Sequence, residues 1–169
     1  MTLRYLAAFG PASIQDIQAW CWLTRLSVPV ERLRPRLRVF RSQEGGELFD
    51  LPEAPRPDPD FPDPVRFLPA YENLLLSQSD RTRVVAKRYL VRLFSRGSFL
   101  VDGFVREAWK FARKESAVSL LIEPFGSLSK LDTSAVTDEG ASLLGFVAAE
   151  GKIGGIRFTS RPRKTRAAK

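Results

Sequence analysis

The first part of the chain combines three helical patterns with two strand patterns. Apolar residues recur at helical spacing in three segments, residues 2–9, 13–20 and 27–33. Polar and apolar residues then alternate in residues 36–41 and 47–51, which predicts two strands joined by a glycine turn. Three helices followed by a hairpin is the order of a winged helix, so we predict such a domain in residues 1–51. Small helix-plus-hairpin units also occur in proteins that never contact DNA.

The helix starts carry recognisable capping residues. Ser13 and Asp16 have the spacing of a capping box, in which each side chain bonds the backbone N–H of the other. Ser27 is the expected N-cap of the third helix, with Pro29 in its first turn. That helix is expected to end near Leu33, because Pro35 disfavours helical backbone at the residue before it.

A proline-rich stretch separates this part from the rest of the chain. Residues 52–69 contain seven prolines, which fix the backbone in extended geometry and remove hydrogen-bond donors. We therefore predict a semi-rigid linker in residues 52–64 and a domain boundary there.

The second part is predicted to be a smaller, β-rich α+β portion in residues 65–151. Its clearest signal is the hairpin at 98–105, where Asp102-Gly103 is a type I′ turn pair between apolar runs. A strand at 118–122 follows, and a C-terminal helix that begins at Ser129 or Asp132 and runs to about residue 149 buries Leu131 among others. The predicted fold class is thus α+β throughout. Residues 152–169 are predicted to be a disordered basic tail, because the apolar pattern fades there.

The positions of the charged residues along the chain indicate a binding partner. The chain has 27 Lys and Arg against 19 Asp and Glu, a net charge of +8, which is typical of proteins that bind nucleic acid. Residues 1–42 carry seven Arg against two acids, and the tail carries seven basic residues and no acid. The candidate phosphate-contacting residues are Arg32, Arg34, Arg36, Arg38, Arg41, Arg161, Arg163, Lys164 and Arg166. The alternatives are a solvated helix-and-strand surface and a solubilising terminus.

The rest of the composition excludes several classes of catalytic and metal-binding site. Without histidine there is no Ser–His–Asp triad, no Cys–His pair and no His-ligated zinc. We expect neither a metal nor a cofactor. The single cysteine, Cys21, excludes an internal disulfide. No apolar run approaches the roughly 20 residues that cross a membrane. We expect core packing, rather than base stacking, for the tryptophans Trp20, Trp22 and Trp109.

Several ordered segments carry a family resemblance. They are Arg4 to Ala12, Leu48 to Asp60, Arg66 to Leu76, Ser79 to Val84, Val101 to Val105 and Glu123 to Leu128. Together they resemble the bacterial winged-helix DNA-binding family that includes the AlkZ-like DNA glycosylases. The resemblance implies tandem winged helices, DNA as the partner, and only the C-terminal half of a longer protein.

The resemblance also shows departures from the family. It implies a catalytic Gln-x-Gln or Gln-x-Asp motif in the N-terminal half, a region that this chain does not resemble. Gln15 and Gln18 have a different spacing, and Gln78-Ser79-Asp80 has the Gln-x-Asp spacing but lies in the region that resembles the C-terminal half. Gln78-Ser79 stand where many relatives have His-Ala, and Glu72 stands where Asp is common.

These observations favour a binder over a catalyst. We interpret the chain as a weakly sequence-specific protein for double-stranded DNA, related to DNA repair, cytoplasmic and associated with the nucleoid. The alternative is a DNA glycosylase, or half of a split one, acting on alkylated or crosslinked DNA. A missing N-terminal half and self-association are the other partner hypotheses.

Overall fold

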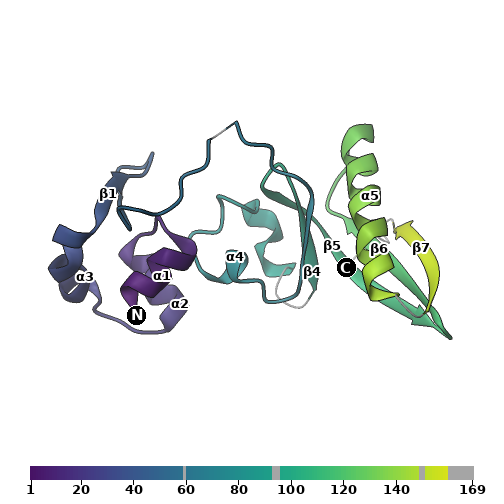
Figure 1. Ribbon diagram of the computed structural model, residues 1–169, viewed down its shortest axis with the longest axis horizontal. Helices are drawn as coiled ribbons and strands as arrows, with labels where there is room; N and C mark the ends of the chain where they lie inside the picture. The colour runs from purple at the N-terminus through teal and green to yellow at the C-terminus, as the bar shows by residue number, and fades with distance from the viewer. Residues whose placement is uncertain (59, 93–95, 149–150, 160–169) are drawn as a thin grey trace, which may run out of the picture. The chain divides into compact units, whose positions relative to one another are not determined.

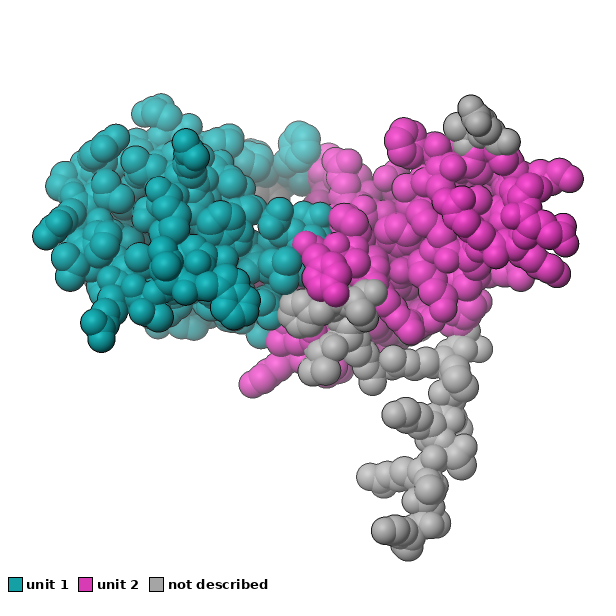
Figure 2. Space-filling model, turned by 90° about the horizontal axis from the view of Figure 1, so that it is seen from below, with its two compact units in different colours: residues 1–61, 72–82 teal, residues 62–71, 83–169 magenta. Residues whose placement is uncertain are grey.

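The chain folds into two compact units, seen in the computed structural model of Figure 1. The structure describes residues 1–58, 60–92, 96–148 and 151–159. Unit 1 contains residues 1–61 and 72–82, and unit 2 contains residues 62–71 and 83–169; Figure 2 colours them separately. The chain therefore enters unit 2, returns to unit 1 for one short segment and then completes unit 2. That return was not predicted from the proline-rich stretch.

Unit 1 consists of short helices and one hairpin. Its elements are α1 (Thr2–Phe9), α2 (Ile14–Cys21), α3 (Ser27–Leu33), the 3-10 turn η1 (Arg34–Arg36), β1 (Arg38–Arg41), β2 (Glu47–Asp50) and α4 (Asn73–Leu76). The strands β1 and β2 are antiparallel, with Arg38 opposite Asp50. Ala12 and Phe49 exchange two backbone hydrogen bonds of 2.9 and 2.8 Å, which tie the hairpin to the link between α1 and α2.

The core of unit 1 is a single cluster of buried side chains from all three helices and β2. Its members are Tyr5, Leu6, Ala12, Ile17, Leu26, Val30 and Phe49. Each of the helices α1, α2 and α3 has only seven or eight residues, so tertiary burial rather than intrinsic helix propensity must hold them.

Helix starts and ends agree with the sequence in part. The capping box of α2 is confirmed, since Ser13 and Asp16 bond each other's backbone N–H. The prediction for Ser27 is wrong, because Leu26 is the N-cap of α3 and Ser27 is its first residue. The Leu26 N–H instead donates to Gln18 Oε1 at 3.0 Å. A side chain of the preceding helix therefore accepts from the N–H of the N-cap residue, and no side chain caps the first turn of α3.

The first strand starts later than predicted. Although α3 ends at Leu33, Arg34 keeps helical angles of φ −44° and ψ −44° despite preceding Pro35. The backbone then makes the η1 turn. Pro35 is compatible with this turn, because its ring fixes φ near the value of about −65° that a 3-10 turn requires. Arg36 thus lies in a helical turn rather than in a strand.

Unit 2 is a five-stranded sheet with one helix. Its elements are β3 (Arg66–Leu68), η2 (Lys87–Arg92), β4 (Gly97–Val101), β5 (Phe104–Lys114), β6 (Ala117–Pro124), α5 (Lys130–Val147) and β7 (Lys152–Phe158). The strand order is β3-β4-β5-β6-β7, with only β6 and β7 parallel. The helix α5 connects these two strands and packs on the sheet (Figure 1). The core includes Phe99, Val101, Val118, Leu120, Ile122, Val136 and Leu144.

Two predictions in unit 2 have clear outcomes. The turn at Asp102-Gly103 is confirmed, with φ of 50° and 70°, both positive as a type I′ turn requires. The burial of Leu131 is wrong, because that side chain is 81% exposed. The buried positions of α5 are Val136, Gly140 and Leu144, and Leu131 lies about 140° away from Val136 around the helix.

The predicted disordered tail is wrong for residues 152–158, which form the edge strand β7. Val118 pairs with Ile153 and Ser119 with Gly155, so Gly154 is an extra residue at a bulge. A Cβ at Gly154 would lie 2.3 Å from Ser119 Oγ, and Gly155 has a φ of +90°. This register therefore requires glycine at both positions. Residues 160–169, including the rest of the predicted tail, lie outside the described residues.

Candidate nucleic-acid interface

The predicted arginines of unit 1 lie on three consecutive elements. Arg32 is in the last turn of α3, Arg34 and Arg36 belong to η1, and Arg38 and Arg41 are the two ends of β1. We call residues 32–41 the arginine segment. The five arginines thus lie on neighbouring elements of unit 1. The other predicted residues, Arg161, Arg163, Lys164 and Arg166, lie outside the described residues.

Arg34 differs from its neighbours because two carboxylates bind it. Its Nε and Nη2 donate to Glu31 at 2.6 and 2.8 Å, and Nη2 also donates to Glu47 Oε2 at 2.6 Å. The guanidinium lies 5.1 Å from the centre of the Phe49 ring. The hydrogen bonds from Arg34 lower the pKa of both glutamates, and the same bonds raise the pKa of Arg34. Arg34 therefore links α3 to the hairpin, and its charge is largely balanced.

Three other arginines of this segment are exposed and have no such partner. Arg32, Arg36 and Arg38 are exposed, and none forms an ion pair with any carboxylate in the described part of the chain. Arg38 lies 5.2 Å from the centre of the Phe40 ring, which leaves its charge unneutralised. Arg41 is also exposed and pairs in register with Glu47, whose pKa it helps to lower. The arginine segment thus presents net positive charge to solvent.

The chain after the hairpin is held by another arginine, Arg56. Its guanidinium pairs with the buried Asp50 at 3.1 Å and donates to the carbonyl of Leu51 at 2.7 Å. It also lies 5.4 Å from the centre of the Phe40 ring. Arg56 therefore anchors the start of the proline-rich stretch on β2, and its role is structural.

Asp16 joins α2 to the returning segment 72–82. Its carboxylate accepts from the Ser13 N–H and hydroxyl at 2.8 and 2.7 Å, and from the Ser79 N–H and hydroxyl at 2.8 Å each. Burial raises the pKa of Asp16, but these hydrogen bonds outweigh burial and the net pKa is lowered. Tyr5 adds a second link, because its hydroxyl donates to the carbonyl of Ser77. Ser79 therefore holds the returning segment against the start of α2.

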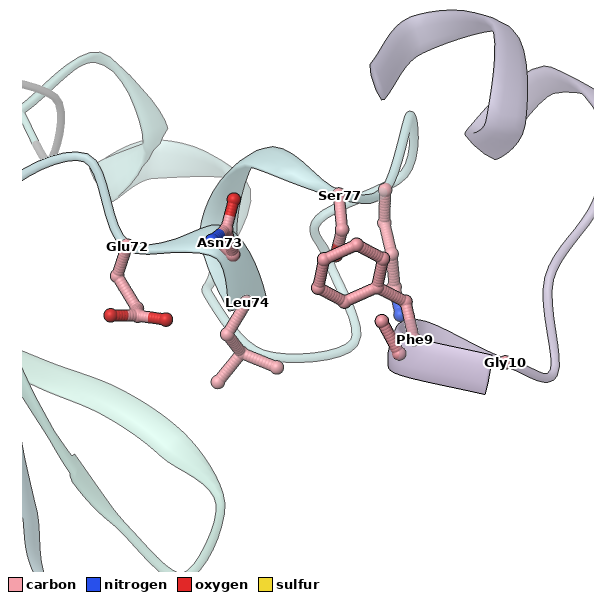
Figure 3. A pocket seen from close by; sticks show the side chains of 8 residues that line it. Phe9, Gly10, Glu72, Asn73, Leu74 and Ser77 are labelled. Carbon is pink, nitrogen blue, oxygen red and sulfur yellow. The ribbon is translucent and has the colours of Figure 1, made fainter. Parts of the chain in front are cut away.

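A pocket of about 330 Å³ lies beside these links, between the end of α1 and α4 (Figure 3). Phe9 and Gly10 line it from α1, and Glu72, Asn73 and Gln78 supply polar groups from the returning segment. Glu72 is the N-cap residue of α4, but its side chain makes no capping hydrogen bond. No local pattern predicts that these two groups of residues lie together, because they are more than sixty positions apart.

The expected core packing of the tryptophans holds for one of the three. Trp109 packs in the core of unit 2 and donates from Nε1 to the carbonyls of Leu68 and Ser98. Trp20 is 37% exposed and packs against the rings of Tyr5 and Phe9. Trp22 is 91% exposed, because its left-handed φ of 59° ends α2 and turns the side chain out of the helix. The prediction for Trp22 is wrong.

The described residues contain no group of three or more His, Cys, Asp or Glu side chains that could hold a metal ion. Among the same residues, no helix is both long and apolar enough to span a membrane.

The family described as DNA glycosylase AlkZ-like matches residues 1–146. The solved structure of Streptomyces sahachiroi DNA glycosylase AlkZ is similar to this chain, with a TM-score of 0.71 and 22% sequence identity. The match covers 94% of this chain and 44% of that one, so the chain spans less than half of the solved protein. No curated protein matches it. The extent of the family match, 146 of 169 residues, shows that the chain belongs to the AlkZ-like DNA glycosylase family.

Proposed function

We propose that this chain binds duplex DNA through unit 1, a winged-helix module that contacts phosphates with little sequence preference. In this proposal α3 is the recognition helix and the β1–β2 hairpin is the wing. The order of three helices and a hairpin supports it, as does the bonding of Ala12 to Phe49, which fixes the hairpin against the helices.

One observation carries the proposal, the exposed and unpaired charge of Arg32, Arg36 and Arg38. A guanidinium without a carboxylate partner keeps its full charge and its donors for a phosphate. These three residues lie within seven positions, across the end of α3 and the start of the hairpin. Arg41 extends the contact along β1, and the basic residues Arg161, Arg163, Lys164 and Arg166 are proposed to add further phosphate contacts.

The test is a fluorescence anisotropy titration of the full chain with two duplexes of unrelated sequence, at about 50 and 200 mM salt. We expect similar affinity for both duplexes and a steep loss of affinity at the higher salt, because binding releases counterions. Deletion of residues 160–169 leaves β7 intact and is expected to flatten the salt dependence without abolishing binding. Absence of binding at the lower salt by the full chain would contradict the proposal.

A second candidate function is hydrolysis of the bond between an alkylated base and its sugar. Family membership and the pocket at Glu72 favour it. In this reaction a water oxygen bonds to C1′ as the C–N bond breaks, and a cationic alkylated base leaves as a neutral molecule. Glu72 would accept the proton of the water and stabilise the positive charge that develops at C1′. The amides of Asn73 and Gln78 would orient the base.

The two candidates are separated by an abasic-site assay on alkylated duplex DNA. If the chain alone is a binder, it produces no abasic sites above the uncatalysed background. If it is a glycosylase, the wild-type chain produces them and Glu72→Gln, which keeps the size of the side chain but cannot accept the proton, does not. Activity that survives Glu72→Gln would exclude this pocket as the reaction site. Measuring duplex binding of the same variant controls for loss of folding.

A further inference from the structure

A second pocket, of about 500 Å³, lies wholly within unit 2. Its walls come from η2, from the start of β5 and from the residues that follow β6. Five side chains define its chemistry, and we call it the aromatic–arginine pocket: Arg88, Tyr89, Phe104, Arg106 and Phe125. Its volume falls in the range of sites that take small organic ligands.

One wall is a rigid stack of aromatic rings. The rings of Tyr89 and Phe125 are nearly parallel, with an interplanar angle of 15° and centres 4.4 Å apart. The Tyr89 hydroxyl donates to the backbone carbonyl of Phe125 at 3.0 Å, and the Arg88 guanidinium lies 4.8 Å from the centre of the Tyr89 ring. These contacts pre-organise the wall. Phe104, which lines the same pocket, is 48% exposed and offers ring surface that no described aromatic residue covers.

A β-bulge places the second guanidinium. Leu100 of β4 pairs with Val105, and the preceding Phe99 pairs with Glu107, so Arg106 is left out of the ladder. Bulges of this kind change the direction in which a side chain points, and they are frequent beside functional sites. Arg106 is exposed, and neither it nor Arg88 forms an ion pair within the described residues.

The surrounding sequence is basic as well. Residues 81–101 contain six Lys or Arg and no Asp or Glu, so this segment stays positive although Arg96 pairs with Glu123. A ligand of this pocket therefore meets an exposed ring, two guanidiniums and a local positive field. A flat apolar ring that carries a negative group matches all three features, and a nucleotide has both parts. An acidic peptide would use the charge but would leave the exposed ring without a partner.

We propose that the aromatic–arginine pocket binds one unpaired nucleotide of single-stranded DNA. The base stacks on Phe104 beside the Tyr89–Phe125 wall, and Arg88 and Arg106 hold the adjacent phosphate. A stacked base inside a duplex has no free face to offer, so this site prefers single strands. The inference concerns a different unit and a different form of DNA from the duplex-binding proposal.

The test compares two labelled strands of equal length and charge, one of oligothymidylate and one of abasic sugar-phosphate units. The full chain is expected to bind the thymidylate strand about tenfold more tightly, because stacking of a base on an aromatic residue gives an advantage of that order. Phe104→Leu is expected to remove this preference. The control Phe146→Leu, which changes an 83% exposed phenylalanine on α5, is expected to keep it.

A second pair of variants tests the phosphate contact. Arg106→Gln is expected to weaken binding of both strands equally and to lower the salt slope by about 0.7, the value for one phosphate contact to a single strand. Arg113→Gln removes the same charge from an exposed position on the same strand and is expected to have little effect. Thermal unfolding of each variant shows whether it has folded. If Phe104→Leu does not fold, the comparison of Arg106→Gln with Arg113→Gln still tests the pocket.

The outcomes separate this inference from the duplex-binding proposal. Equal affinity of the wild-type chain for the two strands overturns the inference, and so does a preference that survives Phe104→Leu in a folded protein. Duplex binding is measured on the same samples. Loss of the base preference with duplex binding intact contradicts only the pocket, whereas a base preference without duplex binding contradicts only the proposal for unit 1.

Discussion

Asp16→Ala is expected to lower the free energy of unfolding of unit 1 by about 2–3 kcal/mol. The substitution removes the capping box of α2 and also the acceptor of the Ser79 N–H and hydroxyl, 63 positions away in the chain. Loss of a helix cap alone costs about 1 kcal/mol, and donors left without a partner add to it. Because Asp16 is only 7% exposed, water replaces these bonds poorly.

The same residue gives the stability of unit 1 a dependence on pH. The folded pKa of Asp16 lies below its ordinary value of about 4. The stabilisation by the carboxylate is therefore complete above that ordinary value, and it is lost as the pH falls through the folded pKa. Asp16→Asn is expected to be less stable at neutral pH and to lose this part of the acid dependence.

Urea unfolding followed by tryptophan fluorescence measures these effects in a Trp109→Phe background, because Trp20 packs against the rings of Tyr5 and Phe9 in unit 1. The matched control is Asp132→Ala, which removes an acid from the equivalent position of α5. There Ser129 accepts from the Asp132 N–H, but the Asp132 carboxylate makes no reciprocal bond among the described residues. An equal loss of stability in both variants would show that Asp16 acts only through the local helix start.

The largest expected effect on DNA binding comes from the triple variant Arg32→Gln, Arg36→Gln and Arg38→Gln. We expect its affinity for duplex DNA at about 0.1 M salt to fall on the order of 100-fold, because three phosphate contacts and their counterion release are lost. The three side chains are exposed and make no ion pair in the described structure, so folding should be retained. Anisotropy titration measures the affinity, and circular dichroism checks the fold.

The matched control removes three charges from unit 2, through Arg113→Gln, Lys114→Gln and Lys130→Gln. These side chains are exposed, so the net charge of the protein changes equally. A comparable loss of affinity in both triple variants would mean that the overall charge, rather than the arginine segment, drives binding. Arg34→Gln is expected to act differently from either, because it breaks the links to Glu31 and Glu47 and lowers stability.

Local signals in the sequence predicted local structure well. The spacing of Ser13 and Asp16 identified the capping box, and Asp102-Gly103 identified the turn, because both features depend on neighbouring residues alone. The five arginines were likewise predicted as one group. Their spacing gave no sign that Arg34 is neutralised, since Glu47 approaches it only when the hairpin folds back on α3.

Features that depend on distant residues were missed for the same reason. No spacing links Asp16 to Ser79, or Phe9 to Glu72. The return of segment 72–82 to unit 1 nevertheless bonds the first pair and places the second pair in the lining of one pocket. The edge strand β7 lacks a continuous apolar face, because its bulge requires glycine where a side chain would strike Ser119. Edge strands are stabilised by backbone pairing with a neighbour, which hydropathy does not record.

The most direct test of the central claim is the slope of log affinity against log salt concentration for duplex DNA. The wild-type chain, the triple variant of the arginine segment and the triple variant of unit 2 are compared under the same conditions. If Arg32, Arg36 and Arg38 each contact a phosphate, the slope of the first triple variant is smaller by about 2.7 and that of the second equals the wild type. Equal slopes for all three proteins would contradict a duplex-binding surface at the arginine segment.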